Sequence, residues 1–384
     1  SAGADRGTFS TASTLSADGG ELSVKGRFNP REQSYDAAIR ADSFPLNSFL
    51  PADSLGIVDL TLQARGTGFD PLLPRTRTSL RAQIDRAEFG GRDFGGIELD
   101  AELDSQRLSG RISDRDEALR LLLSVSGTLT EREQRIGLSG SVFGFDLAAL
   151  GVSPEPIGGS FALDASASAA GKGAYAARIA LDSIEIRNKH RTDRIRPTSV
   201  SLHTDSAATR AEAASGDLSL TFSTPQSADS LIAALTRSAR ALAGQIDAQS
   251  IDMEQLKPAL PDFALRVSAG PDNILNSLLK SRKIAFDALN AEGANCDSLP
   301  VSIRLRTEGL AYGNVVLDTV TADIRQNGKR LEYALGLANA PGNLDNIARA
   351  GLYGHLVRNT GQANLYQRNR AGREGFRFGL DVTW

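Results

Sequence analysis

A serine and a lysine form the strongest candidate for covalent chemistry in this chain. Ser277-Leu278-Leu279-Lys280 has the SxxK spacing, with which penicillin-recognising enzymes place a nucleophile beside a lysine on one face of a helix. Neither companion motif of those enzymes, SDN or KTG, occurs in the sequence. The pair alone therefore does not predict an enzyme.

The residues that usually bind metals or act as nucleophiles are few and scattered. His190, His203 and His355 form no HExxH motif, and paired cysteines are absent. The single cysteine, Cys296, excludes an internal disulfide framework, and no histidine lies near it in sequence. No phosphate-binding or dinucleotide-binding glycine motif is present. We therefore expect a protein that is not an enzyme and that uses no cofactor or metal.

Composition narrows the classes of partner. The chain has 384 residues and a formal net charge of −3, which provides no basic field for nucleic acid. Hydrophobic residues make up 41% but aromatic residues only 6%, and 37 glycines favour thin, aliphatic, turn-rich strands. No apolar run reaches the roughly 18 residues of a membrane-spanning helix, and no signal peptide is visible. The chain begins at Ser1 and ends within an alternating run at Trp384, so we expect an excised segment of a longer protein.

The elements that must position any site are short runs in which apolar and polar residues alternate. Residues 58–65 and 97–104 alternate strictly, which gives each run one apolar and one polar face as a strand. Turn residues separate such runs along the whole chain. The alternation predicts strands at 21–28, 34–41, 57–65, 78–87, 97–104, 107–113, 118–127, 134–143, 160–169, 176–184, 198–204, 217–223, 262–269, 300–307, 315–324, 330–338 and 375–383.

Asn327-Gly328 lies between two of these runs, and it predicts a hairpin with a type I′ turn in which both residues have positive φ. Helix is expected in two places only. The first is about 227–242, capped by Ser227 or Asp229, and a shorter helix is expected at about 273–281. One apolar face of the longer helix contains Leu231, Ile232, Leu235, Ala239 and Leu242. Either helix could be a fixed lid across a sheet end or a movable flap over an apolar groove.

A longer repeat joins three segments of similar pattern. Residues 43–49, 144–150 and 250–256 each read apolar, Pro or Asp, Leu or Met, two spacers, apolar, and they lie 101 and 106 residues apart. Each is expected to end a strand and to begin a single helical turn. We therefore predict three trough repeats at 1–140, 141–245 and 246–384. The expected fold is all-β: a long, curled, antiparallel-rich sheet shaped as a trough (a β-taco), built from tandem repeats, with one or two short helices.

These features resemble a known family. The turn Phe145-Asp146-Leu147-Ala148-Ala149-Leu150, the glycine-terminated strand at 58–68 and the stretch from Ile251 to Val320 are similar to the TamB and AsmA-like proteins of Gram-negative envelopes, above all the branch found in Bacteroidota. The resemblance covers nearly the whole chain. It implies a β-trough of a protein anchored in the inner membrane that reaches an Omp85-type barrel partner in the outer membrane.

The resemblance also implies a function. It predicts a periplasmic segment of a lipid conduit, whose hydrophobic groove holds phospholipid acyl chains during lipid transport and outer-membrane biogenesis or protein assembly. The residues that we expect to line the groove are the inward apolar positions of the predicted strands: Leu60, Leu62, Ile97, Leu99, Leu121, Leu123, Phe161, Leu163, Phe263, Leu265, Val301 and Ile303.

Two other functions remain open from the sequence. A structural or adhesive repeat protein would bury the same apolar face as a dry core, and bulky complementary side chains would then fill the interior. An enzyme could assemble its site from distant residues, which buried carboxylates or histidines gathered in one place would reveal.

Overall fold

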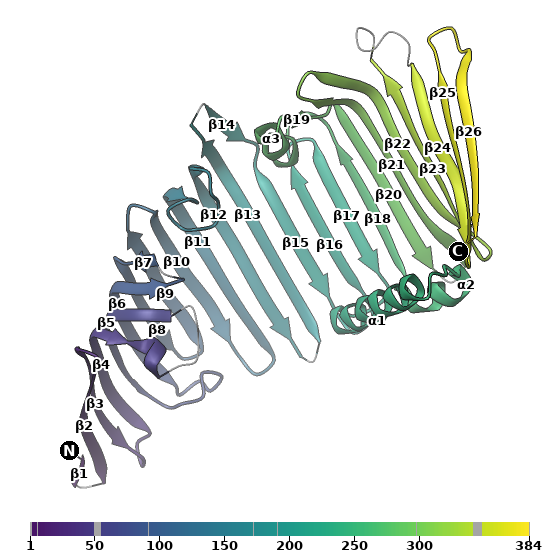
Figure 1. Cartoon of the computed structure of the whole chain (residues 1–384). Helices are drawn as coiled ribbons and strands as arrows, with labels where there is room; N and C mark the ends of the chain where they lie inside the picture. Colours follow the sequence, from purple (N-terminus) through teal and green to yellow (C-terminus); the bar gives the residue numbers. More distant parts are fainter. Residues whose placement is uncertain are drawn as a thin grey trace. The chain divides into compact units, whose positions relative to one another are not determined.

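The computed structural model describes residues 2–5, 7–49, 55–90, 92–171, 173–189, 191–296, 298–340 and 348–383. His190 and Trp384, both considered above, lie outside these residues. Strands account for 67% of the chain and helical segments for 10%, and the strands belong to a long antiparallel sheet that is not closed (Figure 1). The expected all-β fold is confirmed.

The chain divides into two compact units. Unit 1 comprises residues 1–171 and 177–194, and unit 2 comprises residues 172–176 and 195–384. The three predicted trough repeats are a different division, and they remain a prediction. The strands that lie wholly or mainly in unit 1 are β1 (Ala2–Asp5), β2 (Thr8–Ala17), β3 (Gly20–Asn29), β4 (Ser34–Pro45), β5 (Leu55–Thr67), β6 (Arg77–Phe89), β7 (Arg92–Phe94), β8 (Ile97–Asp104), β9 (Arg107–Arg115), β10 (Leu119–Leu129), β11 (Glu133–Asp146), β12 (Gly158–Ala170), β13 (Ala174–Arg187) and β14 (Thr192–Ile195).

Unit 2 contains the helices as well as strands. Its helices are α1 (Ala228–Asp247), α2 (Met253–Leu256) and α3 (Ile274–Ser281), and the 3-10 turn η2 (Lys257–Ala259) follows α2. Its strands are β15 (Thr198–Thr204), β16 (Thr209–Ser215), β17 (Leu218–Thr224), β18 (Phe263–Ala269), β19 (Ile284–Ala285), β20 (Ala288–Cys296), β21 (Leu299–Tyr312), β22 (Val315–Asn327), β23 (Arg330–Asn339), β24 (Arg349–Val357), β25 (Thr360–Arg368) and β26 (Glu374–Thr383).

Each run that the alternation predicts overlaps a strand, but several strands carry no clear signal. The longer ones are β2, β16, β20, β24 and β25. In β16 and β20 the apolar side is made largely of small residues, such as Ala211 and Ala213 in β16 and Ala291 and Gly293 in β20. Alternation of Ala or Gly with polar residues is a weak signal, because neither residue marks a face by its hydrophobicity.

The hairpin at Asn327-Gly328 forms, but the turn is displaced by one residue. Asn327 pairs with Arg330, so Gly328 and Lys329 are the two central residues of the turn. Gly328 has a φ of +59°, while neither neighbour has positive φ. Positive φ at the first central residue alone is typical of a type II′ turn, so the predicted type I′ turn is wrong.

Both predicted helices are present. α1 is capped by Ser227, whose side chain accepts a hydrogen bond from the amide of Ser230, and the helix continues past Leu242 to Asp247. The five residues beyond the predicted end include Gly244, and a single glycine lowers helix stability by only about 1 kcal/mol. α3 begins after Asn273, whose side chain accepts from the amide of Asn276, as the sequence predicts.

The three segments of the sequence repeat all form a helical turn. In the first, the 3-10 turn η1 (Leu46–Ser48) follows β4, and in the second Asp146 at the end of β11 accepts hydrogen bonds from the amides of Ala148 and Ala149. In the third, Asp252 caps α2. The expectation that a strand ends at each turn is wrong for the third segment, because α1 precedes it and Ile251 makes only an isolated bridge with Arg358.

The chain buries little of its surface. It exposes 23552 Å², whereas two separate globular domains of half its 40.7 kDa mass would expose about 17,600 Å² together. Fully buried apolar side chains in the described residues gather in small clusters, such as Ala41, Phe44 and Val58 in unit 1 and Met253, Leu256 and Val301 in unit 2. The excess surface means that much of the sheet lacks a second layer.

Candidate functional site

The eight predicted lining residues of unit 1 share one face of its sheet. Residues opposite each other in an antiparallel pair point to the same side, so a row of such partners marks one face. We call this the apolar face of unit 1. Its first row contains Ala41, Leu60, Ile84, Ile97, Asp114, Leu121, Val142 and Phe161, and its second contains Ile39, Leu62, Ala82, Leu99, Ile112, Leu123, Gly140 and Leu163.

The four predicted lining residues of unit 2 also share one face. Leu265 and Ile303 belong to one cross-strand row, and Phe263 and Val301 precede them by two residues in β18 and β21, which places them on the same side. We call this the apolar face of unit 2. Its rows are Leu202, Ala211, Phe222, Leu265, Gly293, Ile303, Ile324 and Tyr333, and Val200, Ala213, Leu220, Val267, Ala291, Leu305, Ala322, Leu335, Leu352, Leu365 and Phe378.

Parts of the apolar face of unit 2 are open to solvent. Ile303 is 45% exposed, Leu335 44% and Leu365 39%, although cross-strand neighbours flank each of them. Leu123 and Val301 are the exceptions among the predicted lining residues, since each is 7% exposed. Val301 packs against Met253 and Leu256, so α2 covers it. The remaining nine predicted lining residues are half-buried.

Helices border the apolar face of unit 2 at both ends of its strands. At the end of β15, the Thr204 hydroxyl accepts a hydrogen bond from the Ala228 amide at the start of α1 (3.0 Å). At the opposite end, the Ser215 hydroxyl of β16 accepts from the Ile274 amide at the start of α3 (3.1 Å). Thr204 and Ser215 each lie an even number of residues from the apolar rows, so both belong to that face. Figure 1 shows α1 along one end of these strands and α3 at the other.

One charged residue interrupts the apolar rows. Asp114 lies opposite Ile97 and Leu121, and it is only 6% exposed. Its carboxylate accepts a hydrogen bond from the Asp116 amide (2.8 Å) in the turn that follows β9. Burial raises the pKa of Asp114 above its ordinary value. Asp114 therefore holds a turn at the edge of the apolar face. Its buried position disfavours the ionised form of its carboxyl group.

The opposite face of the sheet carries paired charges. Arg77 contacts Asp104 at 2.8 Å and Arg81 contacts Asp100 at 3.0 Å in unit 1, and Arg325 contacts Glu332 at 2.9 Å in unit 2. The first two pairs join neighbouring strands whose residues are directly opposite. Exposed pairs of this kind stabilise a protein by at most about 1 kcal/mol each. They help to keep this face hydrated.

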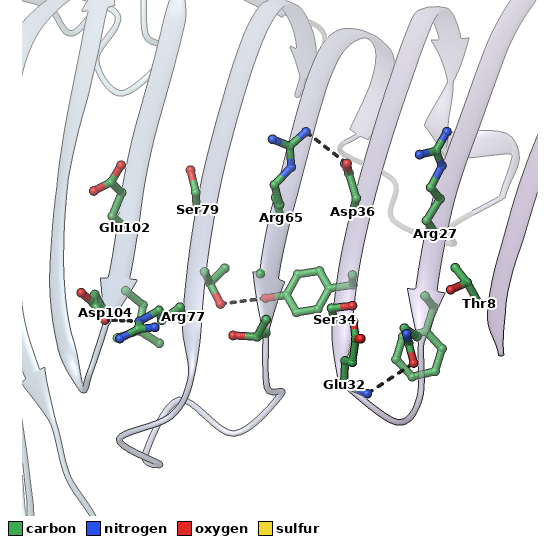
Figure 2. Close-up of a pocket in the computed structure, with 17 residues that line it drawn as sticks. Thr8, Arg27, Glu32, Ser34, Asp36, Arg65, Arg77, Ser79, Glu102 and Asp104 are labelled. Carbon is green, nitrogen blue, oxygen red and sulfur yellow. Dashed lines mark hydrogen bonds and ion pairs between the residues drawn. The ribbon is translucent and has the colours of Figure 1, made fainter. Parts of the chain in front are cut away.

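Several hollows lie on this charged face or extend to it. One of them, of about 710 Å³, is bordered by β2, β3, β4, β5, β6 and β8. Figure 2 shows Arg27, Asp36, Arg65, Ser79 and Glu102 of neighbouring strands in one row along it. The hydroxyls of Tyr35 and Thr78, which also line this hollow, are 2.7 Å apart.

The residues that could do covalent or metal chemistry are not brought together. Ser277 and Lys280 share α3, with no hydrogen bond between their side chains among the described contacts. His203 is exposed on β15 and His355 lies on β24. In the described part of the chain, no group of three histidine, cysteine or acidic side chains could hold a metal ion. None of the helices in that part is long and apolar enough to cross a membrane.

Sequence reasoning missed part of the apolar face. Leu335, Leu352 and Leu365 extend the rows of unit 2 through β23, β24 and β25, but none of them was predicted as lining. Alternation in β23 was visible, but the pairing of β23 with β24, and of β24 with β25, was not. Cross-strand register was the missing information, since a strand's partners decide which rows continue.

Comparison with known proteins gives no relative for this chain. No family model, no curated protein and no solved structure matches it.

Proposed function

We propose that the apolar face of each unit lines a groove that shields phospholipid acyl chains. The observation that carries the proposal is the half-exposure of continuous apolar rows. A protein that leaves such rows unpacked gains stability when something apolar covers them, by about 25 cal/mol for each Å² removed from water. Acyl chains suit this surface, because each CH₂ that leaves water contributes about 0.8 kcal/mol.

The chemistry of the rows suits a moving ligand more than a fixed one. Leucine, isoleucine, valine, alanine and glycine follow one another across the strands, so a chain finds similar contacts at each position. The charged face on the other side would keep the body soluble while the groove is occupied. Lipid headgroups, which need water, would remain at the open side of the apolar face.

The setting of the proposal comes from the resemblance to TamB and AsmA-like proteins. On that basis the chain is a non-enzymatic, periplasmic segment of a conduit for phospholipid between the inner and outer membranes. The full-length protein would be anchored in the inner membrane, with an Omp85-type barrel as its outer-membrane partner. Its role would be in outer-membrane biogenesis and protein assembly.

Two adjacent leucines provide a matched test. Leu121 and Leu122 follow each other in β10, so they point to opposite faces, and only Leu121 belongs to the apolar rows. Leu122 is 40% exposed on the charged side. Leu121→Glu would place a carboxylate in the acyl path, where an unpaired charge costs several kcal/mol. Leu122→Glu adds the same charge to a face that is already polar.

The measurement is native mass spectrometry with lipid extraction on the purified chain and both variants. We expect phospholipid on the wild type and on Leu122→Glu, and much less on Leu121→Glu, with equal circular dichroism for all three. Wild-type protein without lipid, or equal lipid on the two variants, would contradict the proposal. Unfolding of Leu121→Glu alone would favour a dry core.

A further inference from the structure

Tyrosines on the apolar faces lie flat across glycines of neighbouring strands. In unit 1, Tyr35 of β4 is directly opposite Gly66 of β5, and Gly66 is opposite Thr78 of β6. The Tyr35 hydroxyl lies 2.7 Å from the Thr78 hydroxyl. Because neighbouring strands are about 4.8 Å apart, a side chain that joins β4 to β6 must cross the backbone of β5. Tyr35 therefore lies along the sheet and does not stand up from it.

Tyr333 repeats this arrangement in unit 2. It is directly opposite Gly354 of β24, and its hydroxyl donates a hydrogen bond to the carbonyl of Gln362 in β25 (3.0 Å). The ring thus crosses β24 to reach the strand beyond it. The phenolic hydroxyl, which would otherwise be a free polar group on an apolar face, has its partner in the sheet itself.

A phenylalanine in each unit uses a glycine in the same way. A Cβ added to Gly159 would lie 2.9 Å from Cζ of Phe145, and one added to Gly293 would lie 3.2 Å from Cε2 of Phe263. Gly159 precedes Phe161 by two residues, and Gly293 belongs to an apolar row, so both glycines are on apolar faces. In all four pairs the ring occupies the space in which a side chain of the neighbouring strand would stand.

The tilt of each ring decides how far it projects from the sheet. Phe263 shares its face with Leu265 and Ile303, and a phenylalanine ring that stood upright would project beyond these shorter side chains. The Phe263 ring is also nearly parallel to that of Phe222 in β17, with an angle of 19° and centroids 6.4 Å apart. A change in the tilt of Phe263 would therefore break this contact as well as raise the ring.

We propose that Gly66, Gly159, Gly293 and Gly354 are specificity-determining residues of the lipid groove of each unit, because each lets an aromatic ring lie flat and keeps the face clear for an acyl chain. This inference rests on the proposed function of the apolar faces. The rings then supply a large apolar contact area without narrowing the groove. A larger residue at these positions would turn the same ring into an obstacle.

Gly293 is the best position for a test. Its φ is not positive, and apart from the Phe263 ring the nearest atoms to an added Cβ are 3.8 Å away. Valine suits strands, so Gly293→Val should fold with the Phe263 ring lifted into the groove. Gly351 is the matched control, since the three atoms nearest to its added Cβ all belong to Tyr366. Gly351 precedes Leu352 of the apolar row, so this second pair is on the charged face.

The measurement is photocrosslinking to lipid from position 303, because Ile303 lies opposite Gly293 and is 45% exposed. Benzoylphenylalanine replaces Ile303 in the otherwise unchanged chain, in Gly293→Val, in Gly293→Val with Phe263→Leu, and in Gly351→Val. Each protein is irradiated with phosphatidylcholine vesicles and the adducts are measured by mass spectrometry. Gly293→Val should lower the adduct yield roughly tenfold, the effect of losing the burial of about two CH₂ groups. Phe263→Leu should restore the yield, because no ring is left to lift, and Gly351→Val should not change it.

The outcomes separate this inference from the proposed function. Equal yields from the unchanged background and from Gly293→Val would overturn the inference and leave the proposed function standing. Equal loss in Gly293→Val and in its double variant, with unchanged circular dichroism, would also overturn it, since the ring would not be the cause. No adduct in any background would contradict the proposed function and this inference with it. If Gly293→Val does not fold, Gly293→Ala replaces it and should give a smaller loss, and an unchanged yield there would overturn the inference.

Discussion

The apolar faces of the two units share one alternation of side chains but differ in their borders. In unit 1, β5 and β6 have 13 residues each, so the strands span about 43 Å. In unit 2, β15 to β18 have 7 residues each and span about 23 Å, and helices lie at both of their ends. In unit 2 the helices, together with the residues that hydrogen-bond to them, therefore border these four strands at both ends. The four strands are shorter than β5 and β6 of unit 1.

The border residues explain why the short strands stop where they do. Thr204 and Ser215 point to the apolar face, but both are buried. Their hydroxyl oxygens accept hydrogen bonds from amides at the starts of the helices. A polar side chain can be buried at this position only because it has such a partner. The comparison teaches that the width of the apolar face is set by polar anchors at its edges as well as by the length of the alternating run.

Removal of one anchor at the α3 border should have the largest effect. The Asn276 side chain is fully buried, donates to the carbonyls of Pro271 and Phe286, and accepts from the Phe286 amide. Asn276→Ala removes the partner of the backbone N–H and C=O of the buried Phe286 and should lower the free energy of unfolding by about 3 kcal/mol or more. Denaturant titration of the variant and the wild type measures this difference in the free energy of unfolding. Asn290→Ala, on the exposed charged face, is the control, and an equal loss there would refute a special role for the border.

The next comparison separates covered from open parts of the apolar face. Leu123 is 7% exposed and Leu335 is 44% exposed. Leu123→Ala should reduce the free energy of unfolding by about 2–3 kcal/mol, and Leu335→Ala by about 1 kcal/mol or less, because less apolar surface is lost from burial. Equal costs in denaturant titrations would mean that the face of unit 2 is covered in solution, as a dry core would be.

Two aspartates give the units opposite responses to pH. Burial raises the pKa of Asp114 in unit 1, so its ionised form destabilises the fold, and stability falls as pH rises from the ordinary carboxyl pKa to the raised one. Asp114→Asn should therefore stabilise the protein at neutral pH. The gain should vanish below the ordinary carboxyl pKa, where both side chains are neutral. A variant that is less stable at neutral pH would contradict this sign.

Asp217 in unit 2 behaves in the other way. Burial acts to raise its pKa, but hydrogen bonds from the Asn273 side chain (2.6 Å) and the Asp272 amide (2.9 Å) hold the pKa below its ordinary value. Its stabilising effect is present above the ordinary carboxyl pKa and is lost as pH falls through the lowered one. Asp217→Asn should destabilise the protein at neutral pH, with a smaller difference in acid. Denaturation at several pH values would test both aspartates, and a pH-independent difference would argue against the assignment.

The smallest effect is expected from the charged face. Arg81 and Asp100 are 3.0 Å apart, with side chains 73% and 65% exposed. A double-mutant cycle with alanine should give a coupling energy below about 1 kcal/mol that decreases with added salt. A larger, salt-insensitive coupling would show that this face is buried in an assembly.

Strand positions were well predicted because the alternation is a local property. The eight lining residues of unit 1 fell on one face because each run has its own unambiguous polar side. The borders could not be predicted in the same way. Asn276 has no distinctive neighbours in sequence, and its role depends on the backbone of Pro271 and Phe286, which only the folded chain brings to it.

Three further features escaped for identifiable physical reasons. Asp114 reads as the natural end of a strand, and its pairing with Ile97 and Leu121 shows only in the register. On the apolar side of β24 and β25, small residues such as Gly354 and Ala363 interrupt the leucines, so the alternation is weak. The apolar face expected for α1 contains Ile232 and Leu235, which are 62% and 52% exposed, because periodicity shows which residues share a side but not whether that side is covered.

The central claim is that the apolar face, and not the charged face, contacts lipid. Leu335 in β23 and Tyr353 in β24 lie on adjacent strands, have similar exposure and point to opposite faces. Benzoylphenylalanine at each position, followed by irradiation with phospholipid and mass spectrometry, tests the claim directly. We predict phospholipid adducts at position 335 and none at position 353. Adducts at neither position, or equally at both, would contradict it.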